Sequence, residues 1–260
     1  MSRPGLKGTY AAPALEKAFE ILELLADRPS GMQISEMSAI LGRSVGELFR
    51  IVIVMEMQGY LQKSETTDRY TVAYKLLDVA LRATPSQNLI AAALMPMERL
   101  AATVGQSCHL VVANGGRGLV IARQENPGTR GFALKVGAAV DLLHSCSGHV
   151  LLAFAPPART ARLIELAEAA QGGEGCDRAA LAQTLATVRD QGFDSRKSPV
   201  TFGVTDISVP IFGFNGDIMA ALTIPFMEML DGSQKVGLAA ARQELDSTAR
   251  EISAALGHQA

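Results

Sequence analysis

The chain has 260 residues, more than the roughly 100 to 200 of one typical domain, so its length favours two domains. Hydrophobic residues make up 48% of it and charged residues 19%, which excludes an intrinsically disordered regulator. Its 24 basic and 26 acidic residues give a formal net charge of -2, which excludes a protein that binds nucleic acid by charge alone.

The cysteines, the N-terminal residues and the hydropathy of the chain indicate in which cellular compartment the protein is expected. Cys108, Cys146 and Cys176 are odd in number and form no CxxC pair, so we expect neither a disulfide framework nor a zinc finger, and a reducing, cytoplasmic setting. Residues 1–8 are basic without a following apolar run, which predicts a flexible arm rather than a secretory signal. No segment approaches the ~18 consecutive apolar residues of a membrane span, so no membrane partner is expected.

The first helices are predicted from apolar spacing. Apolar residues from Leu15 to Leu25 recur at helical spacing after Pro13. A second, short helix is predicted from Ser35 to Leu41, with Ser35 as its N-cap and Gly42 as its stop. A third helix follows closely, and two helices joined by a short turn that contains glycine are typical of a helix-turn-helix.

The third helix is predicted to begin at a capping box formed by Ser44 and Glu47 and to end at Gln58. Its apolar residues predict a core face made of Val45, Leu48, Phe49, Val52 and Met55. The opposite face then carries Gly46, Glu47, Arg50, Val54 and Met57.

A short hairpin is predicted next, because the β-prone runs 60–63 and 69–72 are separated by five polar residues. A hairpin after a helix-turn-helix is a wing, which lets the third helix enter a major groove while the hairpin contacts the backbone. Arg50 is the strongest single candidate for a base or phosphate contact. The predicted DNA-binding residues are Arg43, Ser44, Gly46, Glu47, Arg50, Lys63, Thr66, Thr67 and Arg69. The same pattern also occurs in protein-binding modules and in plain packing units.

The likeliest join between the domains follows an amphipathic helix at 74–83, which residues 84–86 break. We therefore expect a winged helix-turn-helix domain at 11–73, a linker helix at 74–86 and a second domain at 87–258. A helical run at 89–104 contains Pro96, which either kinks it or marks its first turn after a break.

The second domain is predicted to be α+β, an antiparallel sheet with helices on one side. Its predicted strands are 108–113, 119–123, 132–136, 193–197, 204–212 and 218–225. Its predicted helices are 147–155, 158–170, 178–191 and 233–256, with a mobile glycine-rich loop at 172–175.

Motifs of catalysis are missing from the sequence. It has no GxSxG, HExxH or Walker A run, so no catalytic residue and no cofactor are predicted. His144, Cys146 and His149 are metal-capable types, but their spacing is weak support for a metal site and none is predicted. The small residues 145–148 indicate either close approach of the backbone to a ligand or tight packing.

The order and spacing of several motifs resemble the IclR family of bacterial transcriptional regulators. In the first half these are LGRSVGELFR at 41–50, GYL at 59–61 and YKLL at 74–77. In the second half they are LLHSCSGHVLLAF at 142–154, GF at 192–193, GVTDISVPI at 203–211 and AALTI at 220–224. The resemblance covers about residues 10–256.

The resemblance implies a winged helix-turn-helix joined to a GAF-like (profilin-like) domain that senses a small metabolite. It also implies a homodimer, or a dimer of dimers, on a pseudo-palindromic DNA operator. The effector pocket would lie between the sheet and the segment 142–148, closed by the strand at 204–208. The effector-binding residues implied in this way are His109, Leu142, Leu143, His144, Ser145, Cys146, Asp206 and Ser208.

Three positions depart from the family pattern. Leu143 stands where the family often has histidine, with His144 displaced by one, and Asp206 replaces a small residue such as cysteine or serine. A buried carboxylate disfavours a carboxylate effector unless it is protonated or paired. Glu47 replaces a commoner serine or threonine, which removes a phosphate donor and indicates a capping role.

The sequence thus predicts a sequence-specific transcriptional regulator, repressor or activator, whose operator binding a small metabolite modulates. One alternative is a small-molecule-binding or hydrolytic enzyme with an N-terminal oligomerisation module. Its only candidate nucleophile is Cys146 with His144 or His149. A bare interaction module is disfavoured by the length of the second domain.

Overall fold

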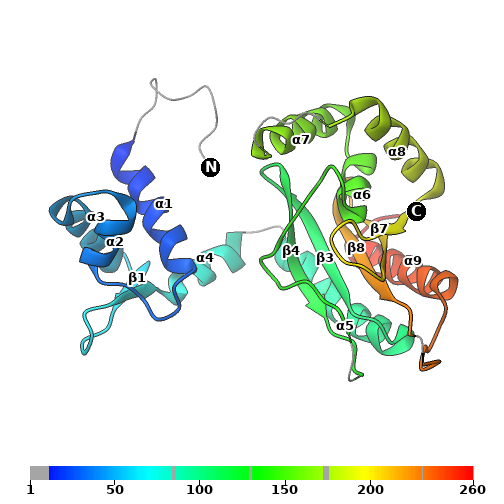
Figure 1. Cartoon of the computed structure of the whole chain (residues 1–260), viewed down its shortest axis with the longest axis horizontal. Coiled ribbons are helices and arrows are strands. Elements are labelled where there is room, and N and C mark those ends of the chain that lie inside the picture. The colour runs from blue at the N-terminus through cyan, green and yellow to red at the C-terminus, as the bar shows by residue number, and fades with distance from the viewer. Residues whose placement is uncertain (1–11, 84–85, 129–130, 172–175, 230, 260) are drawn as a thin grey trace. The chain divides into compact units, whose positions relative to one another are not determined.

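The computed structural model describes residues 12–83, 86–128, 131–171, 176–229 and 231–259 (Figure 1). The chain divides into two compact units, Met1–Thr84 and Pro85–Ala260. The expected arm at 1–8, most of the break at 84–86 and the loop at 172–175 lie outside the described residues. Among the helices of the described ranges, none has both the length and the apolar character to span a bilayer.

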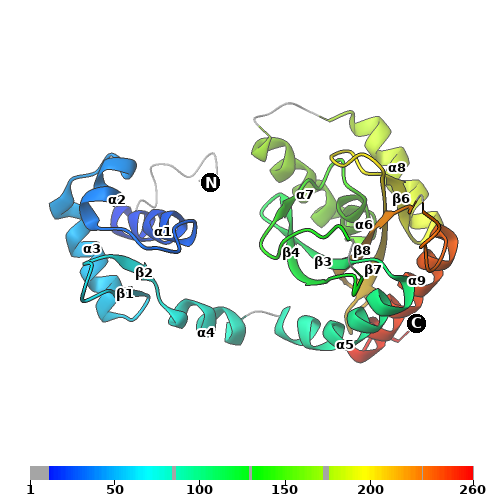
Figure 2. The ribbon, with the colours of Figure 1, turned by 60° about the horizontal axis from the view of Figure 1, so that its bottom comes forward.

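The first unit is a helix-turn-helix followed by a hairpin, as predicted (Figures 1 and 2). The two strands pair antiparallel, with Leu61 opposite Val72, and an isolated bridge joins Met32 to Tyr70. The elements are α1 (Pro13–Ala26), α2 (Ile34–Leu41), α3 (Val45–Met57), β1 (Leu61–Lys63), β2 (Tyr70–Val72) and α4 (Tyr74–Ala83).

The start of α2 differs from the prediction. The N-cap is Gln33 rather than Ser35, because the Gln33 backbone N–H donates to Glu36 Oε2 at 2.9 Å and satisfies one end of a capping box. The Gln33 side-chain amide donates to Thr67 O at 3.1 Å, which ties the hairpin tip to the start of α2. Gly42 ends the helix in the left-handed region at φ 63°, as predicted.

The core of the first unit contains part of the predicted α3 face. Leu48, Val52 and Met55 are buried against α1, α2 and the hairpin. Val45 and Phe49 were also predicted as core, and this is wrong, because they are 49% and 50% exposed. The three short helices bury only the narrow stripe that recurs at i, i+4 and i+7, so the flank of α3 stays in contact with solvent.

The second unit is a six-stranded antiparallel sheet with helices. The strand order is β5-β4-β3-β8-β7-β6. The strands are β3 (Cys108–Asn114), β4 (Arg117–Gln124), β5 (Ala139–Val140), β6 (Asp194–Lys197), β7 (Val204–Phe212) and β8 (Ile218–Met227). The helices are α5 (Ser86–Val104), α6 (Cys146–Phe154), α7 (Pro157–Ala170), α8 (Arg178–Gln191) and α9 (Leu238–Ala255).

Helices cover both faces of this sheet, which corrects the prediction of one covered side (Figures 1 and 2). One core joins α5 and α9 to alternate residues such as Leu222 and Ile224 of β8. The other core joins α6, α7 and α8 to the opposite face, where Ala221 lies. Because β8 is apolar on both faces, its sequence reads as a continuous hydrophobic run rather than an alternating one.

Two further predictions on the second unit need correction. The segment 132–136 is no strand, and the short strand that pairs with β4 is Ala139–Val140 instead. Phe132 and Leu134 line a cavity rather than joining the sheet. The last helix begins at Leu238, five residues later than expected. Pro96 lies inside a continuous α5, which excludes the alternative of a break before it.

Candidate functional site

The N-terminus of α3 is capped as predicted. Ser44 Oγ accepts a hydrogen bond from the Glu47 backbone N–H at 3.3 Å. The Glu47 carboxylate forms an ion pair with Lys17 of α1, and the hydrogen bond from Lys17 is the main cause that lowers the pKa of Glu47. The Glu47 carboxylate is therefore occupied by a contact within the first unit, and the exposed side of the start of α3 is formed by other residues.

Two of the predicted DNA-binding arginines are held by internal ion pairs. Arg43 Nη2 lies 3.2 Å from Glu20 Oε2 of α1. Arg69 Nη1 donates to Gly31 O at 2.7 Å, and its Nη2 donates to Glu36 Oε1 at 2.7 Å. Both side chains are only about one third exposed, so they hold the hairpin and helices together.

The remaining predicted cations differ from one another. Lys63 Nζ pairs with Asp68 Oδ1 at 2.7 Å across the hairpin. Arg50 is exposed on α3 and, within the described ranges, has no ion-pair or hydrogen-bond partner. Gly46, one turn earlier, has open space where a Cβ would point. Thr66 and Thr67 are exposed at the hairpin tip, with Thr66 Oγ1 3.1 Å from Ser64 Oγ.

A cavity of about 140 Å³ lies in the second unit on the sheet face that carries α6; we refer to it as the α6 cavity. Polar residues from several elements meet there, with apolar walls from the 132–140 segment and the loop after β6. Its lining residues are His109, Phe132, Leu134, Ala139, Val140, Asp141, Ser145, Cys146, Ser147, Ser198, Pro199, Val200, Asp206, Thr223 and Pro225.

Of the eight implied effector-binding residues, four line the α6 cavity and four do not. Those that line the α6 cavity are His109, Ser145, Cys146 and Asp206. Leu142 and Leu143 are buried in the core beside it, and His144 is exposed. Ser208 is fully buried and does not line the cavity, but its hydroxyl forms a hydrogen bond with that of Thr223, which does.

Several lining residues were missed from the sequence. Thr223 could have been found, because strand alternation and the pairing of β3 with β8 place it directly opposite His109. Ser198 lies in the loop after β6, and its approach to Asp206 has no local sequence signal. Asp141 could have been recognised as a polar residue just before a helix start.

His109 is a buried histidine with one ring nitrogen unused. It is 3% exposed, and its Nδ1 has no hydrogen-bond partner among the described residues. Burial lowers the pKa of His109 to about 4, so the ring is neutral at physiological pH. A neutral ring of this kind can donate or accept one hydrogen bond with a ligand.

Asp206 gives the α6 cavity its acidic character. Burial is the main cause that raises the pKa of Asp206, and the negative charge of Asp194 raises it further, whereas a hydrogen bond from Ser198 lowers it. Among the described residues that line the cavity, none is a lysine or arginine, and the charged ones are Asp141 and Asp206. The cavity therefore offers hydrogen-bond acceptors and negative charge.

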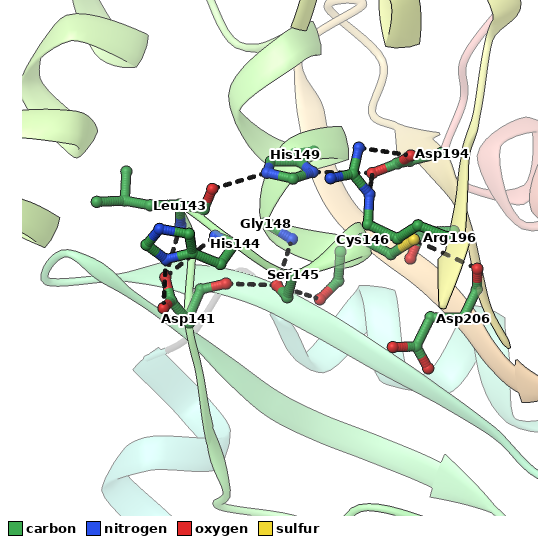
Figure 3. A network of polar contacts seen from close by, with 12 residues as sticks. Asp141, Leu143, His144, Ser145, Cys146, Gly148, His149, Asp194, Arg196 and Asp206 are labelled. Carbon is green, nitrogen blue, oxygen red and sulfur yellow. Dashed lines mark hydrogen bonds and ion pairs between the residues drawn. The ribbon is translucent and has the colours of Figure 1, made fainter. Parts of the chain in front are cut away.

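Residues 145–147 at the start of α6 line the cavity, and the polar contacts around this helix start are drawn in Figure 3. Asp141 Oδ1 accepts from the backbone N–H of Leu143 at 2.7 Å, and Ser145 Oγ accepts from the N–H of Gly148 at 3.0 Å. A Cβ on Gly148 would lie 2.4 Å from Leu142 O, so only glycine fits. Gly148 thus serves tight packing, one of the two roles that the sequence left open, whereas residues 145–147 line the α6 cavity.

A buried polar network fastens α6 to β6 (Figure 3). His149 Nδ1 lies 2.9 Å from Asp194 Oδ2, and His149 Nε2 lies 2.7 Å from Leu143 O. Both neighbours are acceptors, so both bonds form together only when the ring carries two protons. Arg196 Nη2 donates to Asp194 Oδ1 at 3.1 Å. Burial raises the pKa of Asp194, but the hydrogen bonds from His149 and Arg196 outweigh it and leave the pKa below its ordinary value.

Comparison with known proteins identifies the relatives of this chain. Residues 81–254 match the family described as bacterial transcriptional regulator IclR C-terminal, and residues 14–65 match the IclR helix-turn-helix domain. The chain belongs to the IclR family. It is thus a transcriptional regulator with a helix-turn-helix DNA-binding domain and an effector-binding C-terminal domain.

Individual IclR relatives match over almost the whole chain. The HTH-type transcriptional regulator XynR of Escherichia coli (strain K12) is 24% identical over 250 residues, which are 95% of this chain and 98% of XynR. The crystal structure of Pseudomonas aeruginosa HmgR is 25% identical with a TM-score of 0.73, covering 95% of this chain and 100% of HmgR. An IclR homologue from Microbacterium hydrocarbonoxydans, solved in complex with 4-hydroxybenzoate, shares the fold at 20% identity and a TM-score of 0.76, over 94% of this chain and 98% of that one.

Cys146, the candidate nucleophile of the enzyme alternative, makes a hydrogen bond to the backbone and, among the described residues, is not paired with a histidine. The Cys146 thiol donates to Asp206 O at 3.3 Å, and burial raises the pKa of Cys146 far above its ordinary value. Both nitrogens of His149 contact other acceptors, and His144 Nδ1 contacts Asp141. Within the described ranges, no group of three His, Cys, Asp or Glu side chains is placed to hold a metal ion. The matching IclR relatives are transcriptional regulators, which are not enzymes.

The His149–Asp194 network predicts a large stability effect. Asp194→Asn removes the buried carboxylate that binds both His149 and Arg196, so we expect the free energy of unfolding to fall by about 3–5 kcal/mol. Denaturant unfolding followed by circular dichroism measures it. Asp246→Asn, which removes the exposed ion pair with Arg250 on α9, should cost about 0–1 kcal/mol. Equal costs for the two variants would contradict the role given to the network.

His109 predicts a pH dependence of stability. Its pKa is about 4 in the folded protein against an ordinary 6.5, so between these values only the unfolded chain takes up a proton. Stability should therefore fall as the pH drops from 6.5 towards 4, by up to about 1.4 kcal/mol per pH unit from this group. Unfolding curves over this range should show a shallower slope for His109→Gln than for the wild type, and equal slopes would contradict the role given to His109.

Proposed function

We propose that this IclR-family regulator contacts its operator with the N-terminal half of α3 and with the hairpin tip. The supporting observation is the contrast between Arg50 and its neighbours. Arg43, Lys63 and Arg69 are engaged in ion pairs, whereas Arg50 lies exposed beside the open space at Gly46, without a partner among the described residues. In this fold the second helix of the helix-turn-helix enters the major groove.

We further propose that two copies of the chain bind the operator together. The support is apolar surface on the first unit. On α4, Tyr74 is 84% and Leu77 54% exposed, and on α1, Leu15 and Phe19 are each 55% exposed. Exposed apolar side chains gathered on helices mark protein interfaces, and a dimer matches the two-fold symmetry of a pseudo-palindromic operator.

The α6 cavity is the proposed effector site. It combines apolar walls with a few polar groups, among them the unpartnered Nδ1 of His109, which is the usual composition of a small-molecule site. Effector binding would shift operator affinity through α4, and by linkage DNA binding would shift effector affinity by the same factor. Such a protein is a one-component sensor, acting in the cytoplasm where operator and metabolite meet.

The proposed effector is a hydrogen-bond donor, neutral or cationic, rather than a carboxylate. Asp206 and Asp141 line the α6 cavity without a lysine or arginine among the described lining residues, so a carboxylate ligand would bring like charges together. A hydroxyl or ammonium group could instead donate to Asp206. When Asp206 is protonated, a neutral donor–acceptor group still fits.

The DNA contact is tested with Arg50→Ala. We expect it to weaken binding to a duplex selected from a random pool by a factor of about 5 to 100, as for loss of about 1–3 kcal/mol from one specific contact. Fluorescence anisotropy at fixed salt measures it. Arg162→Ala removes the same charge from an exposed position on α7 and should leave affinity unchanged. No preference of the wild type for the selected duplex, or no loss in Arg50→Ala, would contradict the proposal.

The effector class is tested with three probes of one shape: benzylamine, benzyl alcohol and benzoate. We expect calorimetry to give at least tenfold weaker binding for benzoate, because only benzoate opposes the charge of Asp206. The amine should weaken as the pH falls through the raised pKa of Asp206, because protonation removes its counter-charge. Asp206→Asn should abolish the preference for the amine over benzoate. Tightest binding by benzoate would show that the class is wrong.

A further inference from the structure

The outer flank of α3 carries an apolar stripe that the unit's core does not use. Val45 and Phe49 are 49% and 50% exposed, and Ile53, one turn further, is partly buried on the same side. The three residues recur at i, i+4 and i+8, and we call them the α3 stripe. The buried face of the same helix is already complete with Leu48, Val52 and Met55.

The surroundings of the α3 stripe are suited to a polyanion. The two acids of α3 are engaged, Glu47 with Lys17 and Glu56 with the hydroxyl of Tyr70. The cation next to the stripe is Arg50, which has no partner among the described residues. The backbone N–H groups at the helix N-terminus add further positive potential. This charge pattern favours DNA over an apolar protein surface as the occupant.

We infer that the α3 stripe reads thymine by contact of Val45 and Phe49 with the C5-methyl groups in the major groove. This rests on the proposed insertion of α3 into that groove. The thymine methyl is the one apolar group that the base edges present there, so an apolar side chain can distinguish thymine from the other bases. Gly46, with open space around it, lets the helix approach the bases closely enough for such contacts.

On this inference, α3 makes two kinds of contact with the bases, one polar and one apolar. Arg50 supplies charge and hydrogen bonds towards guanine or phosphate, whereas Val45 and Phe49 recognise a methyl group at neighbouring base pairs. The half-sites are therefore expected to contain thymines at fixed positions next to the Arg50 contact. Hydrogen-bond readout alone does not distinguish thymine from uracil, because their polar groups are identical.

The experiment removes the methyl group alone. A duplex is selected from a random pool with the full-length protein, and each thymine of its half-sites is then replaced singly by deoxyuridine. At one to three positions we expect affinity to fall about fourfold per methyl, the value for one buried methyl-sized group. Fluorescence anisotropy at one fixed salt concentration measures each duplex, because affinity for DNA depends on salt.

Variants then assign the methyl contacts to residues. In Val45→Ala or Phe49→Ala the ratio of affinities for the thymine and deoxyuridine duplexes should fall towards one at the corresponding position. Arg50→Ala should weaken both duplexes and preserve the ratio. A loss of folding would weaken both duplexes too, so the ratio separates contact from structure, and thermal unfolding of each variant checks the fold.

The outcomes distinguish the inference from the function on which it rests. If a specific duplex is selected but deoxyuridine changes nothing at any position, the thymine contact is overturned while operator binding by α3 stands. If no duplex is enriched, the proposed function fails as well. If Phe49→Ala disrupts self-association in sedimentation and leaves the thymine ratio intact, the stripe is a protein interface and the inference is wrong.

Discussion

The attachment of α6 to the sheet by the buried pair of His149 and Asp194 is the constraint on which the second unit depends. Because both ring nitrogens of His149 lie within hydrogen-bonding distance of acceptors, α6 can rotate only by breaking buried polar contacts. The close approach of Gly148 to Leu142 then fixes the helix start against the segment that precedes it. The α6 cavity lies beside these contacts, so its shape depends on His149, Asp194 and Gly148, although none of the three lines it.

The order of elements could be predicted because local signals mark them: apolar spacing, the Ser44 cap and the glycines that end helices. What the sequence could not supply is which side of an element is covered. Val45 and Phe49 read as core because they are apolar at helical spacing, yet the unit has too few elements to bury them. The placement of helices on both faces of the sheet was hidden likewise, because a strand buried on both faces has no alternation to read.

The site residues that could be predicted are those whose residue type and place on a strand or helix decide where the side chain lies. His109 and Asp206 lie on strands, and strand geometry brings them to the same face of one sheet. The engagement of Arg43 by Glu20, or of Arg69 by Glu36, depends on contacts between segments far apart in sequence, and no local pattern announces it. Loop residues such as Ser198 were missed for the same reason. A basic residue near the second helix of a helix-turn-helix therefore does not identify a DNA contact until its ion-pair partners in the folded protein are known.

The hairpin of the first unit is fastened at several points to the segment between α1 and α2. Arg69 bonds to Gly31 and Glu36, Gln33 bonds to Thr67, and Met32 bridges to Tyr70. These bonds fasten the wing to the start of α2, and the shared core of Leu48, Val52, Leu61 and Tyr70 packs α3 against the same hairpin. In the proposed complex, the spacing between α3 and the hairpin tip has to match the distance from the major groove to the flanking backbone. On this proposal, an effector would change operator affinity by moving whole DNA-binding units relative to one another, with the spacing inside each unit unchanged.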